Sequence, residues 1–146
     1  MFLGEYSHTI DEKGRMTIPA KLRPGFASGL VVTRGFEKCL MVYPIETFHT
    51  LEKQTHALNL TDDTSRTVFR FLFGGASDST LDGVGRVLVP EYLREYAGLE
   101  TDVIVIGMGS YLEVWDKGKW QEQLASLNDP EANGRRFASL NLSMGA

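Results

Sequence analysis

Short apolar runs bounded by turn residues recur along this chain of 146 residues, and they predict a protein built largely on short β-strands. The runs are rich in β-branched, aromatic and leucine side chains, and Gly, Asp or Pro stands near most of their ends. The predicted strands span residues 6–10, 15–18, 30–33, 40–43, 87–89, 103–106 and 111–115.

Helical periodicity predicts helices that connect and flank these strands. Apolar residues at helical spacing predict a helix over 45–58, and Asp62 and Asp63 open a second, strongly apolar helix that ends at Gly74. Prolines open two short helices, at 20–23 and 91–97. Near the C-terminus the pattern predicts a helix at 119–127, a helix-start signal at Asp129-Pro130, a short last helix at 135–140 and a loose end at 143–146.

One motif of this pattern occurs twice in the sequence. Six identities recur at a constant spacing of 71 residues: Asp11 and Asp82, Gly14 and Gly85, Arg15 and Arg86, Pro19 and Pro90, Leu22 and Leu93, and Arg23 and Arg94. The likeness continues through the following strands, where Tyr43 matches Trp115 and Phe48 matches Trp120. Each copy reads strand, turn, strand, short helix, strand, turn, strand, longer helix. A copy of about 70 residues is marginal alone, so we expect the two halves to share one core.

Composition places the chain among ordinary globular proteins. It is 42% hydrophobic and 23% charged, and no apolar run approaches the ~20 residues that a membrane helix needs. The first residues lack a basic start and an extended apolar region, so we expect no secretory signal. Cys39 is the only cysteine, and the three histidines have no metal-ligand spacing. We therefore expect no disulfide, metal or cofactor, and a reducing, cytoplasmic location.

Charge is unevenly distributed. The chain carries a formal net charge of −4, which argues against a uniformly basic surface for polyanions. However, residues 11–38 are basic, with three acidic residues against six basic ones: Lys13, Arg15, Lys21, Arg23, Arg34 and Lys38. One basic face on an otherwise acidic protein is compatible with nucleic-acid binding.

The repeated turns carry the candidate site. Asp at the first turn position and Gly at the fourth suit a type I turn closed by a left-handed glycine, so Asp11, Gly14, Asp82 and Gly85 are expected to order the turns. The arginine after each glycine projects from the end of its turn and can donate to a polyanion. Charge and position add further candidate DNA-binding residues, which are Lys13, Lys21 and Arg23. Val84 stands where the first copy has Lys13, so the two sites should differ.

Two other interpretations of these residues are weaker. Duplicated Asp turns are also found in aspartic proteases, where two carboxylates share a proton, but an arginine beside each Asp favours the ionised form. The aromatic stretch at Phe69, Phe71 and Phe73 could stack on single-stranded bases, but its apolar neighbours favour a core or an interface. No nucleotide-binding or catalytic motif appears in the sequence, and we expect no enzyme activity.

Taken together, the motifs closely resemble those of the bacterial MraZ family over residues 1 to about 140. The residues that carry the resemblance are the opening Met1-Phe2-Leu3-Gly4-Glu5-Tyr6, the two Asp-x-x-x-Arg motifs, Leu81-Asp82-Gly83-Val84-Gly85-Arg86, Pro90-x-x-Leu93-Arg94 and Tyr96-Ala97-Gly98-Leu99.

The resemblance implies an α+β fold in which two tandem AbrB-like, swapped-hairpin β modules pack as a pseudo-dimer within one chain, with flanking helices. The expected divisions are a first module at 5–52, a helical connector at 53–78, a second module at 79–123 and a C-terminal helix and tail at 124–146. It also implies a ring-like homo-oligomer, and the short apolar runs of the sequence predict no membrane partner.

For function, the resemblance implies a cytoplasmic, nucleoid-associated transcription factor that represses the division and cell-wall gene cluster headed by its own gene. Its partner would be double-stranded DNA with repeated promoter elements, which would face the turns that bear Arg15 and Arg86. A ring would let an acidic chain bind DNA through many weak contacts. The alternative is a module for assembly or interaction that uses the same β core without binding DNA.

Overall fold

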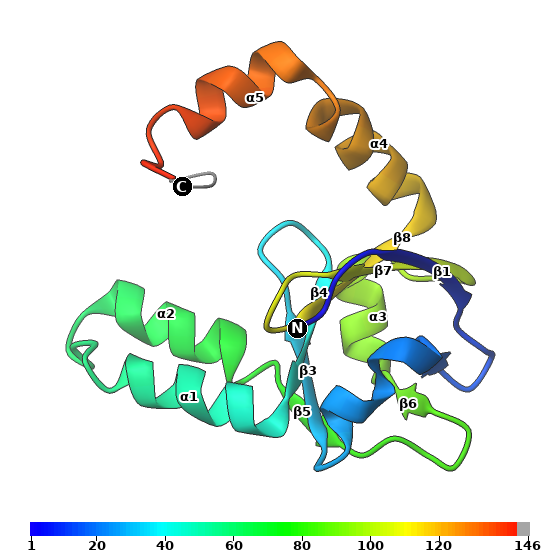
Figure 1. Cartoon of the computed structure of the whole chain (residues 1–146). Coiled ribbons are helices and arrows are strands. Elements are labelled where there is room, and N and C mark those ends of the chain that lie inside the picture. The colour runs from blue at the N-terminus through cyan, green and yellow to red at the C-terminus, as the bar shows by residue number, and fades with distance from the viewer. Residues whose placement is uncertain (143–146) are drawn as a thin grey trace. The chain divides into compact units, whose positions relative to one another are not determined.

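The computed structural model describes residues 1–142 and has an α+β fold (Figure 1). The loose end expected at 143–146 lies outside the described residues. Contacts divide the chain into a first unit at Met1–Asp116 and a second unit at Lys117–Ala146. The strands of the first unit are β1 (Glu5–Thr9), β2 (Arg15–Thr17), β3 (Leu30–Arg34), β4 (Leu40–Pro44), β5 (Ser77–Ser79), β6 (Arg86–Leu88), β7 (Asp102–Gly107) and β8 (Leu112–Asp116). Its helices are η1 (Ala20–Phe26), α1 (Ile45–Thr55), α2 (Asp63–Leu72) and α3 (Glu91–Ala97).

The strands interlock the two halves of the repeat. The larger sheet is antiparallel, with the order β1-β7-β8-β4-β3-β5, and β2 pairs with β6 in a separate small sheet. Thus β1 of the first half pairs with β7 of the second, while β5 of the second half pairs with β3 of the first. The fold is therefore a pair of AbrB-like modules that exchange strands, a pseudo-dimer within one chain.

The strand register shows an internal twofold relation. At the centre of the larger sheet Met41 lies opposite Glu113, its equivalent in the repeat, and in the small sheet Met16 lies opposite Val87 in the same way. A pseudo-twofold axis therefore passes through both pairs. It relates the first turn (residues 11–15) to the second turn (residues 82–86).

The main core lies on the inner face of the larger sheet. Side chains alternate along β4, so Leu40 and Val42 face this core while Met41 and Tyr43 face the opposite side. The short helices close it with Leu22 from η1 and Leu93 from α3, which are both buried. Burying each such side chain contributes about 1.5–3 kcal/mol relative to exposure, so the two halves depend on each other for stability.

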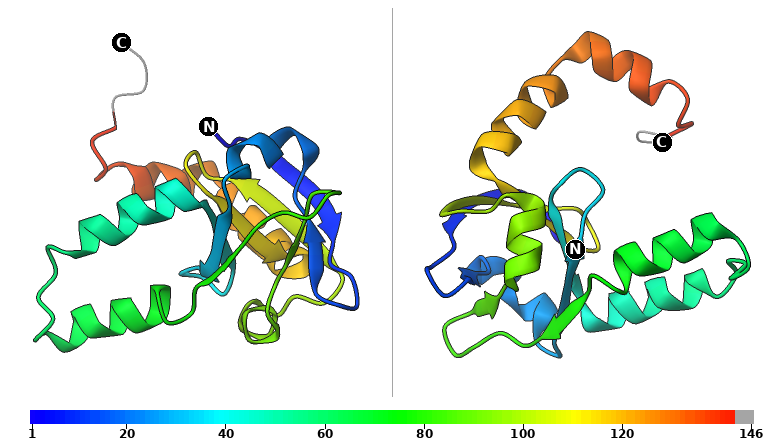
Figure 2. Two further views of the ribbon diagram at one scale, coloured as in Figure 1. Left: turned by 90° about the horizontal axis from the view of Figure 1, so that it is seen from below. Right: turned by 180° about the vertical axis from the view of Figure 1, so that it is seen from behind.

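A smaller core lies on the outer face of β3 and β4, beneath α1 and α2 (Figure 2). Phe48 from α1 and Leu72 from α2 are buried in it, beside Tyr43. The Asp62 side chain accepts from the backbone N–H of Thr64 and caps α2, as its start signal predicted. The predicted apolar helix therefore exists, and much of its apolar side is used within the chain.

Some predicted elements differ in extent. Helix α1 ends at Thr55 and not near Leu58, because the N–H of Leu58 bonds the carbonyl of Thr55 in a tighter final turn. The two strands expected to form a hairpin around the first turn meet at only one bridge, between Ile10 and Met16, since each pairs instead with the other half. The strand that the repeat implies before the second turn is the polar β5, which has no apolar pattern of its own.

The second unit holds α4 (Lys117–Leu127) and α5 (Pro130–Phe137). The Asp129 side chain accepts from the N–H groups of Glu131 and Ala132, so α5 begins at the predicted start signal. The short last helix expected at 135–140 is thus wrong in its bounds. No helix within residues 1–142 combines the length and apolar character needed to cross a bilayer.

Candidate nucleic-acid interface

The first turn is organised by one carboxylate. Asp11 Oδ1 accepts from the backbone N–H groups of Lys13 and Arg15, at 2.9 Å each, and Oδ2 accepts from Arg15 Nε at 2.8 Å. The backbone closes the same turn, because the Gly14 N–H donates to the Asp11 carbonyl at 2.9 Å. The turn therefore holds both its own shape and the direction of the Arg15 side chain.

The second turn repeats this arrangement. Asp82 Oδ1 accepts from the N–H groups of Val84 and Arg86, at 3.0 and 2.8 Å, and Oδ2 accepts from Arg86 Nε at 2.8 Å. Gly85 donates to the Asp82 carbonyl at 3.0 Å. The two sites share one backbone design, although the residues between Asp and Gly differ.

Each turn orients its arginine through Nε alone. The side chains of Arg15 and Arg86 are 35% and 33% exposed, and each pairs with its aspartate through Nε. Within residues 1–142 no protein group bonds their terminal nitrogens. A guanidinium fixed at Nε with two free terminal nitrogens can donate in a fork to a guanine edge or to a phosphate.

The aspartates are suited to this role and not to proton exchange. Hydrogen bonds from the backbone N–H of Arg15, its side chain and the N–H of Lys13 lower the pKa of Asp11, against a smaller opposing effect of desolvation. The same groups around Asp82 lower its pKa. Each carboxylate is thus held ionised beside its own arginine, and a shared-proton pair like that of an aspartic protease has no basis here.

Two glycines permit the turns. Gly14 has φ of 82° and Gly85 has φ of 81°, in the left-handed region predicted from the sequence. Both are buried, and the space beside each is filled by a side chain, so a Cβ at Gly14 would lie 2.9 Å from Arg94 Nε. Backbone conformation and space therefore both require glycine.

The two turns lie on the same side of the first unit. In Figure 1 the blue segment between β1 and β2 and the green segment between β5 and β6 project together, and the reversed view in Figure 2 agrees. Backbone bonds link them across the halves, from Ile18 N–H to the Gly85 carbonyl at 2.9 Å and from Val89 N–H to the Gly14 carbonyl at 2.8 Å. The structure thus brings Arg15 and Arg86 into one region.

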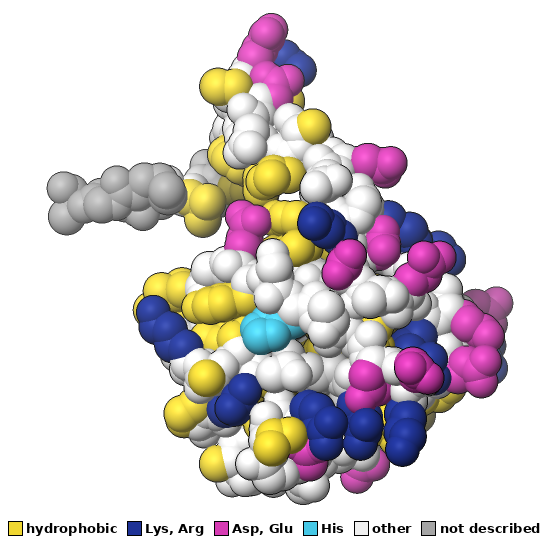
Figure 3. Space-filling model, turned by 90° about the vertical axis from the view of Figure 1, so that its right-hand side faces the viewer, with side chains coloured by type: hydrophobic (Ala, Val, Ile, Leu, Met, Phe, Trp, Pro, Cys, Tyr) yellow, Lys and Arg dark blue, Asp and Glu magenta, His cyan; other side chains and the backbone are white. Residues whose placement is uncertain are grey.

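The other expected site residues occupy different surroundings. Lys13 is exposed at the tip of the first turn, whereas Arg23 is half-buried with its Nε donating to the Ile18 carbonyl at 2.9 Å. Lys21 is exposed on η1. The basic segment at 11–38 also divides, because Arg34 donates to carbonyls at the end of α2 and Lys38 lies 4.6 Å from the ring centre of Tyr96. Figure 3 shows Lys and Arg side chains gathered along the lower edge of one face, with carboxylates among them.

The pseudo-twofold axis reveals a contrast that sequence reasoning noted only at the turn tip. The first half carries Lys13, Thr17 and Lys21 at three equivalent positions, where the second half carries exposed Val84, Leu88 and Tyr92. These three positions are therefore basic or polar in one half and apolar in the other.

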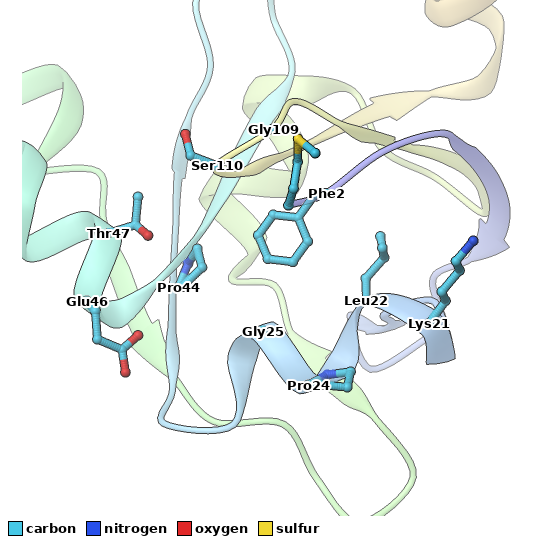
Figure 4. Close-up of a pocket in the computed structure, with 11 residues that line it drawn as sticks. Phe2, Lys21, Leu22, Pro24, Gly25, Pro44, Glu46, Thr47, Gly109 and Ser110 are labelled. Carbon is cyan, nitrogen blue, oxygen red and sulfur yellow. The ribbon is translucent and has the colours of Figure 1, made fainter.

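A hollow of about 500 Å³ lies between η1, the start of α1 and the turn that joins β7 to β8 (Figure 4). The Phe2 ring forms part of its wall, stacked on Phe26 with ring centres 5.0 Å apart, and Gly25 leaves room for that ring. Lys21 and Glu46 add single charges to the lining. The opening residues of the chain thus help to close the core, and the hollow shows no cluster of reactive groups.

Groups for other chemistries are not assembled in the described part of the chain. It holds no set of His, Cys, Asp and Glu side chains arranged to bind a metal ion. Burial raises the pKa of the Cys39 thiol to about 12, which keeps it protonated and unreactive. The paired turns remain the most developed candidate site.

Fold and site together define a duplicated AbrB-like protein that presents two symmetry-related Asp–Arg turns. Both halves of the chain, residues 1–71 and 72–138, match the family described as "MraZ protein, putative antitoxin-like". The chain belongs to the MraZ family.

Relatives from several bacteria are similar over most of their length. A protein of Herpetosiphon aurantiacus is 47% identical over 129 residues, which cover 88% of this chain and 90% of its own. Proteins of Roseiflexus sp. (strain RS-1) and Acetivibrio thermocellus are 44% and 42% identical, covering 94% and 97% of this chain and 94% and 100% of theirs. All three are named "Transcriptional regulator MraZ".

Proposed function

We propose that the protein is a sequence-specific transcription regulator that binds repeated promoter elements in double-stranded DNA and represses the division and cell-wall genes headed by its own gene. The relatives named as transcriptional regulators support the class of function. It would act in the cytoplasm, associated with the nucleoid. The observation that carries the DNA-binding part is the pair of turns, each of which fixes an arginine at Nε and leaves its terminal nitrogens unbonded by any residue that the structure describes.

The turns would contribute unequally to binding. In the first, Lys13 and Arg15 offer two cations to phosphate or to guanine O6 and N7. In the second, Arg86 acts beside the exposed Val84, whose methyl groups suit an apolar contact such as a thymine methyl. We therefore expect Lys13 and Arg15 to contribute more of the salt-dependent affinity.

An assembly would make these few charges sufficient. The chain has a net charge of −4, so one copy offers DNA a small basic region on an acidic protein. Several copies held in a ring would engage successive DNA repeats at high effective concentration. Apolar side chains are available for subunit contact, because Met1 and Leu3 are 94% and 59% exposed and Phe69 is only half-buried.

Light scattering combined with DNA titration tests the assembly. At micromolar concentration the protein should have a mass several times that of the 16.3 kDa chain, and diluted, dissociated chains should bind repeated DNA much more weakly. A 16.3 kDa species with full affinity would contradict both the ring and multivalent binding.

A second candidate function is an assembly or interaction module that does not bind DNA. The exposure of the apolar side chains Val84, Leu88 and Tyr92 favours this alternative, since exposed apolar surface commonly contacts proteins. Binding to DNA from upstream of the gene that weakens steeply with salt would favour regulation by DNA binding, and its absence would favour the alternative.

A further inference from the structure

A second pair of arginines, Arg23 and Arg94, lies behind the two turns. They are equivalent in the repeat and sit on η1 and α3. Both are half-buried, and neither forms an ion pair with a described residue. Sequence reasoning included Arg23 in the site on charge and position and omitted Arg94. The repeat was the signal that could have found it.

Arg94 supports the first turn, although it belongs to the second half. Its Nε donates to the Val89 carbonyl at 3.0 Å, and the Val89 N–H donates to the Gly14 carbonyl at 2.8 Å. Its guanidinium lies directly against Gly14, so that a Cβ there would be 2.9 Å from Nε and 3.0 Å from Cζ. One buried residue, Val89, thus connects the arginine to the turn.

Arg23 supports the second turn in the same way from the first half. Its Nε donates to the Ile18 carbonyl at 2.9 Å, and the Ile18 N–H donates to the Gly85 carbonyl at 2.9 Å. A Cβ at Gly85 would collide with the Arg23 side chain and would lie 2.7 Å from its Cδ. The support is therefore reciprocal, with each turn held from the opposite half.

We propose that Arg94 and Arg23 are positioning residues, each of which sets the orientation of the DNA-binding turn of the opposite half relative to the body of the protein. This proposal rests on the proposed DNA-binding function. The aspartates fix the shape of each turn internally, but they do not attach the turn to the body of the protein. Besides the Ile10–Met16 bridge and the pairing of Arg15 with Leu88, the contact with Val89 and Arg94 anchors the first turn to the opposite half.

Mutations of Arg94 and Arg23 should affect DNA binding differently if these residues anchor the turns, contact DNA directly, or only stabilise the fold. A direct phosphate contact by Arg94 would add to the effect of Arg15, because the two would act independently. General destabilisation would affect both turns equally. A crossed anchor instead couples Arg94 to Arg15 and leaves Arg86 untouched, while Arg23 couples to Arg86 and leaves Arg15 untouched.

Double-mutant cycles on full-length protein test this crossing. The probe is a duplex from upstream of the gene, at one fixed salt concentration. Arg94→Ala should weaken binding about tenfold, keep that effect in an Arg86→Ala background, and lose most of it in an Arg15→Ala background. Arg23→Ala is the matched control and should show the opposite pattern. Equal effects of Arg94→Ala in both backgrounds would overturn the proposal, as would full additivity with Arg15→Ala.

Hydrogen exchange in the free protein provides a readout that does not need DNA. Arg94→Ala should speed exchange of the Val89 amide, which bonds Gly14, and leave the Ile18 amide protected. Arg94→Lys keeps the charge but lacks the Nε donor, so it should also speed exchange at Val89, and it replaces the alanine variant if that one does not fold. Unchanged exchange at Val89 would refute the anchor. Crossed exchange effects without any binding of the wild type to the duplex would instead refute the DNA-binding function and keep the anchor.

Discussion

Replacing Arg15 by Ala should separate DNA binding from stability. The ion pair that it removes has both side chains about one-third exposed, at 35% and 36%, and such pairs contribute only ~0.2–1 kcal/mol. Asp11 keeps its two backbone donors, so the turn should retain its shape. The melting temperature should therefore fall by no more than about 4 °C.

Binding should suffer much more than folding. An arginine that donates in a fork to a base contributes roughly 1–3 kcal/mol, which corresponds to a loss of roughly 5-fold to 150-fold for each engaged contact. If Arg15 meets phosphate, the loss should be similar on all duplexes and the salt dependence should decrease by about one charge. Fluorescence anisotropy with labelled upstream and shuffled duplexes, at several salt concentrations, measures both effects.

Glu12→Ala is the matched control, because Glu12 is exposed in the same turn. Losing a negative charge there should leave DNA affinity unchanged or slightly higher. Unchanged affinity of Arg15→Ala across all salt concentrations would refute the assignment of Arg15 to the interface. Circular dichroism melting of the same samples shows whether any loss of binding comes from unfolding.

Three further predictions concern stability. Gly85→Ala should cost at least ~1 kcal/mol because its φ is 81° and Arg23 fills the adjacent space, whereas Gly83→Ala, with open space around it, should be nearly neutral; equal melting temperatures would contradict this. Burial raises the pKa of Glu113, so the stability that its protonated carboxyl contributes is lost as the pH rises through its pKa in the folded protein. Glu113→Gln stays neutral and should therefore raise the melting temperature at pH 7 but not near pH 4. The pKa values of Asp11 and Asp82 are lowered, so their stabilisation is present above the unfolded value near ~4 and is lost as pH falls through the folded value. The free energy of unfolding, measured with denaturant from pH 6 to pH 3, should therefore fall less steeply in the Asp11→Asn, Asp82→Asn double variant than in the wild type. Parallel pH curves for the two proteins would count against this assignment.

The local features of the fold could be predicted from the sequence because local chemistry determines them. A turn that needs a carboxylate to accept backbone N–H groups and a left-handed residue to close it leaves a clear Asp-x-x-Gly pattern. Because this pattern occurs in both halves, it predicted both turns, and the role of Arg15 and Arg86 at their ends stays a prediction. The same logic predicted the caps at Asp62 and Asp129.

The interlocking of the halves could not be worked out from the strand pattern itself. Apolar alternation identifies a strand but not its partner, so only the family resemblance implied that the halves interlock, and the pairing of β1 with β7 was not predicted. The polar β5 exists because β3 offers it a partner, and no local preference predicts it. For the same reason charge alone could not show that Arg34 closes the end of α2 or that Arg23 supports the second turn.

The most direct test of DNA-binding regulation compares affinity for the duplex upstream of the gene with affinity for a shuffled duplex of equal length and composition. At physiological salt the wild type should prefer the upstream duplex by about 10³-fold or more, and its affinity should fall steeply as salt rises. The Arg15→Ala, Arg86→Ala double variant should lose that preference while remaining folded. Equal affinity of the wild type for both duplexes, or a double variant that binds as well as the wild type, would contradict sequence-specific binding through the paired turns.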